Sequence, residues 1–520
     1  MNSIDYFDRG WRQNPMAPCM VEGETGKAHS YDEIRQATLK IADTLRQRGY
    51  DIGSKAAVLG YNTVQTFTVV LSILRAGVTW LPINPRNGLV DNVQILNRFD
   101  CEILFYLSSF ANDIPSILAA APGIRECLCI DQPGPDKIGL AEWSAMGQTL
   151  ENPRQHNPEH VYAIQPTGGT TGVPKGVMLS ERSLETCMAN FMAVTPCLER
   201  PIFLAVAPLT HAAGQVFQYL LAQGGCGVLY AKVDRQQILA AIGYYRITHL
   251  FLPPTLIYEL LAQPGVRDYD YSSLRYFIYG ASPMAPEKLQ EAIEVFGPVM
   301  CQIYGQTEGG VPTTFLAPDD HFDNGQIASH QRLSSCGRAT PFARMGVVDT
   351  NGNLLGNHQT GELVIGGQGL MVGYYKDPET TAEVLRGGWL HTGDIGYRDD
   401  AGFYYIVDRL KDIIISGGFN IYSCEVEQAL LSHPAVQDCA VVGAPDAKWG
   451  EIVIAVVQLK PSQEHITAEV LIAHSRTQLG GMKTPKQIDF IDALPRSAVG
   501  KILKREIRAR YWNGKDRLVS

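Results

Sequence analysis

The segment that most constrains this chain is a ten-residue run rich in glycine and threonine, residues 167–176, which reads TGGTTGVPKG. It lies between two apolar runs, one ending at Ile164 and one beginning at Val177. Glycines let the backbone approach an anion, successive N–H groups form a concavity, and threonine and lysine add donors and charge. The segment therefore predicts a phosphate-binding loop. Its candidate binding residues are Thr167, Gly168, Gly169, Thr170, Thr171, Gly172 and Lys175.

Two other interpretations of this loop must be weighed. A Walker loop needs a Gly-Lys pair followed directly by Ser or Thr, whereas Lys175 follows Pro174 and precedes Gly176. The Walker interpretation therefore fails. An ordinary glycine-rich and threonine-rich surface loop has the same composition, so the choice depends on the motifs that follow along the chain.

Composition limits the classes of function. The chain has 520 residues, 45% hydrophobic and 19% charged, which is typical of a globular protein of several domains or subdomains. A net charge of −9 argues against a nucleic-acid-binding surface. Eleven cysteines without a metal-like pair indicate reduced thiols and a cytoplasmic location. We expect no signal peptide, because the N-terminal residues MNSIDYFDRGWRQ contain no apolar run. We expect no membrane span either, because Arg75 interrupts the best apolar stretch.

Helices and strands alternate along the first half of the chain. A capping box at Ser30 opens a helix that ends at Gly49, and a buried strand is expected at 56–59. A second helix closes near Gly77. The rhythm returns after the glycine loop, with strands expected at 202–207, 227–230, 249–252, 275–279 and 299–303 and helices at 215–221 and 236–245. The alternation predicts an α/β fold in which helices cover a parallel sheet.

Ligands of open α/β sheets bind beyond the C-terminal ends of the strands, so the segments that follow these strands are candidate sites. The candidates are the turn Gly280-Ala281-Ser282, the run from Tyr304 through Gln306 and Thr307 to Glu308, and the segment around His211. Each has an ordinary interpretation as well. The first can be a common turn, and a lone histidine is more often a satisfied core or surface residue.

The later motifs decide between these interpretations. They are GWLHTGD ending at Asp394, DRLKD containing Arg409 and Lys411, SGGFN containing Gly418, and PRSAVGK ending at Lys501. Together with the glycine loop and YGQTE, they occur in the order and approximate spacing typical of the adenylate-forming acyl-CoA synthetases. The chain resembles this family from about residue 30 to residue 510. Luciferases and peptide-synthetase adenylation domains belong to the same superfamily.

The resemblance implies a fold and a domain division. Residues 1–410 would form a large N-terminal AMP-binding domain of doubly covered sheets plus a β-rich subdomain. Residues 411–520 would form a small, mobile α+β C-terminal domain, with a hinge near Lys411. The basic tail from Lys501 to Arg510 would be either a solvated helix face or a landing site for the phosphates of CoA.

The resemblance also implies a two-step ligase that uses ATP, Mg²⁺ and CoA. A carboxylic acid and ATP would give acyl-AMP and pyrophosphate, and a thiol would then displace AMP. The glycine loop would hold the β- and γ-phosphates, and fixed donors and cations suit that developing charge. The other nucleotide contacts would be Thr307 on the α-phosphate, Glu308 on Mg²⁺, Asp394 and Arg409 on the ribose, and Tyr304 on the adenine, backed by Gly280, Ala281 and Ser282.

The remaining implied roles concern the two half-reactions. His211 would lie where the carboxylate and later the thiol approach. Lys501 would bridge carboxylate and phosphate during adenylation and then leave as the C-terminal domain rotates. The same rotation would bring the loop containing Gly418 towards the pantetheine tunnel. Such a rotation would let one cleft be dry and cationic for the first half-reaction and open to a thiol for the second.

The sequence departs from the family in three places. Gly168 replaces a serine, Pro166 replaces a tyrosine, and Ser423 replaces a proline before a helix expected near Glu425. The first removes a hydroxyl donor, and the last is interpreted as structural only. The charged residues assigned to catalysis are all present, so we expect an active enzyme.

The substrate is inferred from the segment 208–218, which contains no acidic residue and therefore disfavours an amino acid. Its small and apolar residues, with Gly309, Gly310 and Val311, favour a medium-chain, alicyclic or aromatic acid. A stand-alone enzyme that loads a carrier protein and a luciferase-like oxidative enzyme remain alternatives. The expected partners are small molecules, not nucleic acid, and a homodimer stays open.

Overall fold

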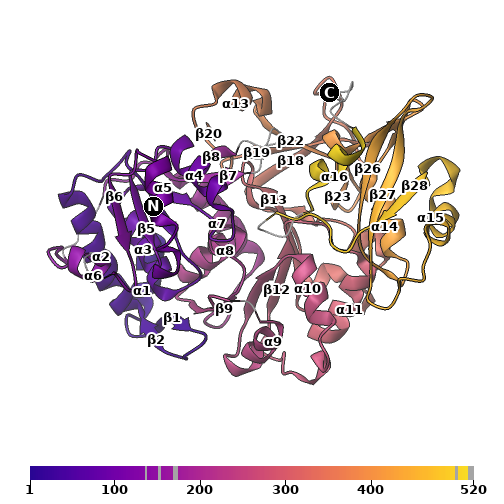
Figure 1. Ribbon diagram of the computed structural model, residues 1–520. Coiled ribbons are helices and arrows are strands. Elements are labelled where there is room, and N and C mark those ends of the chain that lie inside the picture. The colour runs from indigo at the N-terminus through magenta and orange to yellow at the C-terminus, as the bar shows by residue number, and fades with distance from the viewer. Residues whose placement is uncertain (135–137, 150–153, 168–173, 233, 498–501, 513–520) are drawn as a thin grey trace.

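A computed structural model of the chain describes residues 1–134, 138–149, 154–167, 174–232, 234–497 and 502–512. Figure 1 shows the indigo and purple N-terminal part of the chain on the left and the yellow C-terminal part on the right. The architecture is a mixed α/β fold with a large N-terminal domain and a small C-terminal domain, as predicted.

The first sheet has the strand order β20-β8-β7-β4-β3-β5-β6. Neighbouring strands from β7 to β6 run parallel, whereas β8 and β20 are antiparallel. Because β3, β4 and β5 are buried on both faces, they form continuous apolar runs. The bounds are β3 Lys55–Leu59, β4 Thr79–Pro82, β5 Ile103–Tyr106, β6 Glu126–Cys129, β7 Val161–Thr167, β8 Lys175–Ser180 and β20 Gly373–Tyr374.

The second sheet has the strand order β17-β14-β13-β12-β11-β9-β10-β1-β2. Its strands from β13 to β1 run parallel, and the outer strands are antiparallel. The predicted strands are all present, with ends that agree to within three residues. The bounds are β1 Pro18–Glu22, β2 Ala28–Ser30, β9 Ile202–Ala205, β10 Cys226–Leu229, β11 His249–Leu252, β12 Tyr276–Gly280, β13 Met300–Gln306, β14 Gly310–Leu316 and β17 Arg338–Ala339.

The helices of the large domain begin and end where local chemistry predicts. Ser30 Oγ accepts a hydrogen bond from the Glu33 N–H at 3.1 Å, and Ser30 N–H donates to the Glu33 carboxylate at 2.7 Å. Gly77 ends α3 with φ +82°, a conformation that favours glycine. The bounds are α1 Asp5–Gln13, α2 Tyr31–Gln47, α3 Val64–Ala76, α4 Leu89–Arg98, α5 Ile114–Ala120, α6 Leu140–Trp143, α7 Glu181–Val194, α8 Ala212–Leu221, α9 Arg235–Tyr244, α10 Pro254–Leu261, α11 Pro286–Phe296, α12 His330–Leu333 and α13 Pro378–Val384.

Helix α8 packs between the two sheets. The ring of Phe217 on α8 lies 4.8 Å from that of Phe67 on α3 and 5.8 Å from that of Phe203 on β9. All three side chains are buried. Phe217 therefore belongs to the core between the two sheets. Truncating such a residue to alanine costs about 3–5 kcal/mol of stability.

A third, antiparallel sheet follows in the β-rich subdomain, with β19 and β22 at its centre. Most of the GWLHTGD motif lies on β22, and β23 ends with Asp408 and Arg409 of the DRLKD motif. The bounds are β18 Ala343–Val348, β19 Gly361–Gly367, β21 Leu385–Arg386, β22 Trp389–Arg398 and β23 Tyr404–Arg409. A small hairpin, β15 Phe322–Asp323 and β16 Gln326–Ile327, lies before it.

The C-terminal domain is built on a fourth sheet with a hydrophobic cluster on each face. Its strands are β24 Ile414–Ser416, β25 Phe419–Ile421, β26 Val436–Asp446, β27 Gly450–Leu459 and β28 Gln487–Phe490, and its helices are α14 Ser423–Leu431, α15 Ala468–Lys483 and α16 Lys504–Trp512. Helix α14 begins at Ser423, two residues before the predicted start. The structure describes no helix that is long and apolar enough to span a membrane.

Candidate active site

The strands that carry the predicted phosphate loop are in place. Thr167 at the end of β7 pairs with Lys175 at the start of β8, and the Thr167 hydroxyl lies 3.5 Å from the Lys175 carbonyl oxygen. The other predicted loop residues, Gly168, Gly169, Thr170, Thr171 and Gly172, lie outside the described residues, as does Lys501.

Asp394 is the meeting point of the second and third sheets. Its Oδ2 accepts hydrogen bonds from the Tyr304 hydroxyl at 2.8 Å and from Gln306 Nε2 at 2.9 Å. Its Oδ1 lies 2.9 Å from Nε of Arg409. The structure thus brings together three residues predicted to hold adenine and ribose. Burial, and then the Asp394 carboxylate, raise the pKa of Tyr304 well above its ordinary value.

The turn bearing Asp394 is itself supported by Glu362 on β19. Glu362 Oε2 lies 2.7 Å from Nδ1 of His391, and Oε1 accepts the Gly393 N–H at 3.0 Å. The Thr392 hydroxyl accepts the Asp394 N–H at 3.0 Å. These contacts fix the backbone on both sides of the carboxylate.

Glu308 is linked to the phosphate loop through a residue that the sequence analysis missed. The hydroxyl of Tyr374 on β20 donates to Glu308 Oε1 at 3.0 Å, and Nζ of Lys175 lies 4.9 Å from the Tyr374 ring centroid. Burial, and then Glu308, raise the pKa of Tyr374. Tyr374 therefore contacts both the predicted metal ligand and the predicted phosphate ligand.

The turn after β12 is tightly constrained. Gly280 pairs with Ile303 on β13, and a Cβ at Gly280 would lie 2.6 Å from the Ile303 carbonyl oxygen. Ala281 has φ +68°, in the left-handed region that non-glycine residues rarely adopt. Ser282 follows, partly buried. Strain of this kind is concentrated at ligand sites.

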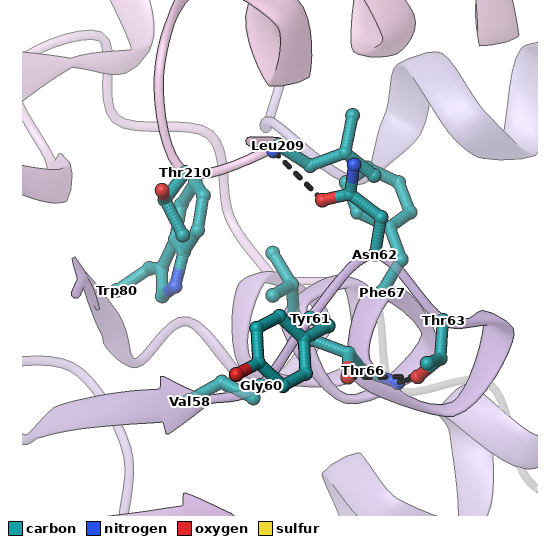
Figure 2. Close-up of a pocket in the computed structure, with 11 residues that line it drawn as sticks. Val58, Gly60, Tyr61, Asn62, Thr63, Thr66, Phe67, Trp80, Leu209 and Thr210 are labelled. Carbon is teal, nitrogen blue, oxygen red and sulfur yellow. Dashed lines mark hydrogen bonds between the residues drawn. The ribbon is translucent and has the colours of Figure 1, made fainter. Parts of the chain in front are cut away.

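His211 is the residue that precedes the first turn of α8, and its Nδ1 lies 3.0 Å from the Thr210 hydroxyl. A small pocket on the first-sheet side of this loop is lined by Tyr61, Phe67, Trp80, Leu209 and Thr210, among others, as Figure 2 shows. The loop that carries the histidine thus borders side chains that follow or belong to strands of the first sheet.

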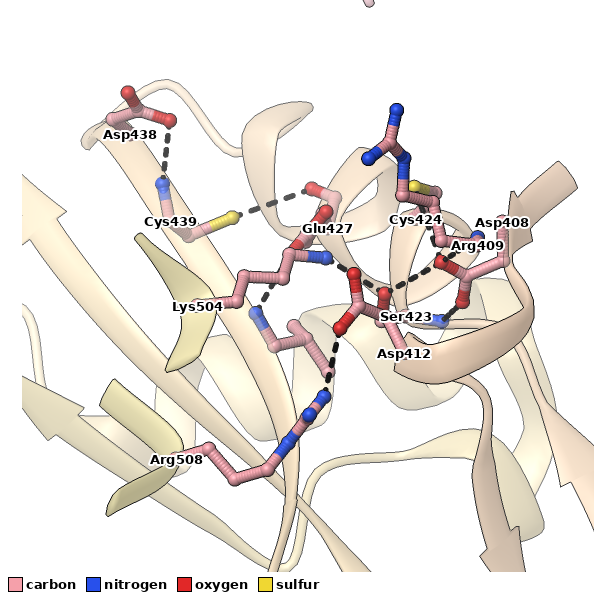
Figure 3. Close-up of polar contacts among 11 residues, drawn as sticks. Asp408, Arg409, Asp412, Ser423, Cys424, Glu427, Asp438, Cys439, Lys504 and Arg508 are labelled. Atoms are coloured by element: carbon pink, nitrogen blue, oxygen red, sulfur yellow. Dashed lines mark hydrogen bonds and ion pairs between the residues drawn. The ribbon is translucent and has the colours of Figure 1, made fainter. Parts of the chain in front are cut away.

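A buried network joins the end of β23 to the C-terminal domain, as Figure 3 shows. The Ser423 N–H donates to Asp408, and the Ser423 hydroxyl donates to Asp408 Oδ1 at 3.0 Å. Lys504 Nζ lies 2.7 Å from both Ser423 Oγ and Glu427 Oε1. Burial acts to lower the pKa of Lys504, but Glu427 and its neighbours raise it above the ordinary value.

This network takes up two cations of the basic tail, Lys504 and Arg508, whereas Arg505 and Arg510 are exposed. Arg508 Nη2 lies 2.8 Å from Asp412, and the side chains of Lys504 and Arg508 are only 17% and 19% exposed. Neither residue lies on a solvated face or is exposed for CoA phosphates, because both pair with buried acids. Gly418, at the tip between β24 and β25, is exposed and has φ +81°.

Signals in the sequence could have found part of what was missed. Gln306 lies inside the YGQTE motif, yet no role was assigned to it. The segment Gly60-Tyr61-Asn62 directly follows β3, so the rule applied to later strands would have selected it. Tyr374 carries no local signal, since it reaches Glu308 from 66 positions away.

Known proteins match the chain over nearly its whole length. The family model described as AMP-binding enzyme matches residues 7–375, and the AMP-binding enzyme C-terminal domain matches residues 425–501. The medium/long-chain-fatty-acid–CoA ligase FadD8 of Mycobacterium tuberculosis is 35% identical, over 91% of this chain and 84% of its own length. Feruloyl-CoA synthase of an Amycolatopsis species is 33% identical, over 96% and 97%. The solved amide bond synthetase McbA of Marinactinospora thermotolerans has a TM-score of 0.88 at 28% identity, covering 98% of this chain and 100% of that chain.

Proposed function

The chain belongs to the AMP-binding enzyme family, and on that basis we propose which of its residues convert a carboxylic acid, ATP and CoA into an acyl-CoA. The enzyme is an AMP-forming acid–thiol ligase. One observation carries the residue assignment: Tyr304 from β13 and Arg409 from β23 both contact the Asp394 carboxylate. The contacts of Tyr374 with Glu308 and Lys175 support it.

The reaction has two half-reactions. In the first, a carboxylate oxygen of the acid attacks the α-phosphorus of ATP, the bond to pyrophosphate breaks, and acyl-AMP forms. In the second, the CoA sulfur attacks the acyl carbon, the thiol proton is lost, and AMP leaves. Both transition states gather negative charge on oxygen, which fixed cations and N–H donors stabilise.

The proposed nucleotide contacts are those that the family resemblance implies, and the contacts at Asp394 support them. We assign the ribose hydroxyls to Asp394 and Arg409, the adenine to Tyr304 and the turn Gly280-Ala281-Ser282, and the phosphates to Thr307 and the loop 167–175. His211 is assigned to the acyl carbon in both half-reactions. Lys501 is assigned to the carboxylate and α-phosphate in the first.

A magnesium ion suits the donors present. The described residues contain no cluster of three acidic, histidine or cysteine side chains that could hold a metal ion without further ligands. Mg²⁺ usually takes one or two carboxylates, phosphate oxygens and waters, so Glu308 together with the phosphates of ATP fits it. The ion would neutralise phosphate charge during adenylation. Tyr374 occupies only one hydrogen-bonding position on Glu308 Oε1.

We divide the domains at Lys411 and place the hinge there. The fourth sheet begins three residues later, at Ile414, and its two hydrophobic clusters contain only residues beyond the proposed hinge. A rotation at this point would bring Lys501 to the site in one half-reaction and Gly418 in the other.

The proposed substrate is a medium-chain, alicyclic or aromatic acid. The two curated relatives are named for a medium- or long-chain fatty acid and for feruloyl-CoA. The start of α8 offers small residues, and Ala212 and Gln215 are partly exposed there. A cytoplasmic location fits eleven cysteines that are all free thiols. A homodimer is an open part of the proposal, to be tested by sedimentation.

The decisive experiment is pyrophosphate release with Mg·ATP over a panel of fatty, alicyclic, aryl and amino acids, each with and without CoA. Release that depends on one acid class and yields its thioester supports the proposal and identifies the substrate. Release without thioester would favour the carrier-protein alternative, tested with a phosphopantetheinyl protein, or the oxidative one, tested by oxygen consumption.

A further inference from the structure

The loop that carries His211 is held from outside its own sheet. Residues 206–211 connect the end of β9 to the start of α8, so their backbone groups lie beyond the ladder of the second sheet. A loop of this kind needs other partners for its N–H and C=O groups. Several of those partners are side chains of the first-sheet region, one in the loop after β3 and one on β7.

Asn62 provides three of the contacts. Its Nδ2 donates to the carbonyl oxygens of Ala205 at 3.2 Å and Ala207 at 2.9 Å, and its Oδ1 accepts the Leu209 N–H at 3.1 Å. Figure 2 shows the last of these bonds between Asn62 and Leu209. Both amide donors and the acceptor are used, so one orientation of the amide satisfies all three groups.

Gln165 provides the next contact along the loop. It lies on β7, two residues before Thr167, and is 7% exposed. Its Nε2 donates to the carbonyl oxygen of Thr210 at 3.1 Å, and the Thr210 hydroxyl lies 3.0 Å from Nδ1 of His211. The backbone is therefore fixed at residues 205, 207, 209 and 210, and the last of these contacts the imidazole.

We propose that Asn62 and Gln165 are positioning residues that hold His211 in place for acyl transfer. They act through the backbone of residues 205–210 and touch no reacting atom. The inference rests on the proposed role of His211. Because a misplacement of about 1 Å can lower a rate about 100-fold, two amides outside the His211 loop can set the efficiency of the site.

The test is a double-mutant cycle between Asn62 and His211. Asn62→Asp keeps an acceptor for the Leu209 N–H and places an oxygen against two carbonyls. We expect it to lower acid-dependent pyrophosphate release and thioester formation from supplied acyl-AMP by about 10- to 100-fold. ATP affinity, measured by calorimetry, should stay within about twofold, since no contact to the nucleotide residues changes. In a His211→Ala background the same change should cost less than about threefold.

Asn92→Asp is the matched control, because Asn92 is a buried asparagine whose Nδ2 also donates to a backbone carbonyl, that of Asn84 at 3.3 Å. Its cost in rate should be below about twofold. Gln165→Leu, which removes the donor and keeps the side-chain length, is the second variant if Asn62→Asp folds poorly. Equal costs of Asn62→Asp with and without His211, or equal costs of the Asn62 and Asn92 variants, would overturn the inference.

A readout independent of activity separates this inference from the proposed function. In protein labelled with ¹⁵N-histidine, the His211 ring signal, assigned by its loss in His211→Ala, should shift in Gln165→Leu and Asn62→Asp and stay in place in Asn92→Asp. Unshifted signals in both variants would overturn the positioning role even in an active enzyme. A wild-type enzyme that releases no pyrophosphate with any acid would refute the proposed function, while the shifts would still report the contact.

Discussion

The ammonium group of Lys504 lies 2.7 Å from the carboxylate of Glu427, and burial excludes most water from the pair. Lys504 also donates to Ser423, which in turn donates to Asp408. Lys504 thus links acids on both sides of the proposed hinge, Asp408 before it and Glu427 after it.

Removing that cation should destabilise the C-terminal part of the chain. Lys504→Met leaves the Glu427 carboxylate buried without its partner, and such a loss costs about 3–5 kcal/mol. Chemical denaturation should show it as a lower midpoint. Glu427→Gln added to Lys504→Met should recover part of the loss, and Lys486→Met, at an exposed lysine, should lose little. A Lys504→Met midpoint equal to that of Lys486→Met would contradict the account.

The hydroxyl of Tyr374 should affect the use of Mg²⁺. Tyr374→Phe removes the hydrogen bond to Glu308 and keeps the ring beneath Lys175, so the carboxylate is less well oriented. Removing a hydrogen bond that orients a metal ligand lowers metal affinity or activity by about 10- to 100-fold. The Mg²⁺ concentration for half-maximal pyrophosphate release should rise by about that factor.

Tyr375→Phe is the control for this experiment. It removes a comparable bond, from the Tyr375 hydroxyl to Asp100 at 2.6 Å, at the neighbouring residue. Its Mg²⁺ dependence should match that of the wild type. The same shift in both variants would point to general damage rather than to Glu308.

Asp394→Asn should weaken ATP binding. The change replaces one carboxylate oxygen by an NH2 donor, so the ion pair with Arg409 is lost and one of the present acceptor positions is gone, and it removes the carboxylate proposed for the ribose. Calorimetry should give a dissociation constant for ATP raised by about 10- to 100-fold, since charge-assisted bonds are the strong ones. Asp400→Asn, at an exposed acid of the same subdomain, should bind ATP as the wild type does. Unchanged affinity in Asp394→Asn would exclude the ribose assignment.

Lys501→Ala should separate the half-reactions. Loss of a transition-state charge contact lowers a rate by about two to three orders of magnitude, here that of adenylation. Thioester formation from supplied acyl-AMP should be largely intact, because Lys501 is assigned to the first step alone. Lys460→Ala in the same domain is the control. An equal loss in both half-reactions would contradict the proposed alternation of domains.

His249 should make the protein sensitive to acid. Burial lowers the pKa of His249 to about 3, so the folded chain keeps the imidazole neutral. A lowered pKa contributes stability that is present above about pH 6.5 and is lost as the pH falls towards 3. Between pH 7 and pH 5 the wild type should lose about 2 kcal/mol more than His249→Gln. His330→Gln, at an exposed histidine, is the control, and identical losses in wild type and His249→Gln would refute the assignment.

Much of the fold could be predicted because its signals are local. The capping box at Ser30 and the helix end at Gly77 depend on residues within a few positions, and the alternation of apolar runs follows from burial of a parallel sheet. The strand-end rule selected Tyr304 and Glu308 for the same reason, since both follow a buried run directly.

The rest depends on contacts between distant parts of the chain. Asn62 reaches Ala207 across 145 positions, and Lys504 reaches Ser423 across 81. No spacing rule links such residues, so the basic tail was interpreted from its charge alone. The contact between Phe217 on α8 and Phe67 on α3 is of the same kind, because it joins residues that are distant in the sequence.

The serine at position 423 has one more consequence. Asp408 precedes the proposed hinge at Lys411, and Ser423 follows it. A rotation at this hinge would therefore separate the Asp408 carboxylate from the Ser423 N–H, whose hydrogen bond it accepts. A proline, which the family resemblance leads one to expect there, has no amide hydrogen and would leave that tether unmade. The energy of one domain orientation therefore depends in part on Ser423, whose N–H and hydroxyl both donate to Asp408. Two ligases with the same catalytic residues would thus differ in the lifetime of each orientation of the C-terminal domain. The ratio of the two half-reaction rates, compared between Ser423→Pro and the wild type, would measure this difference.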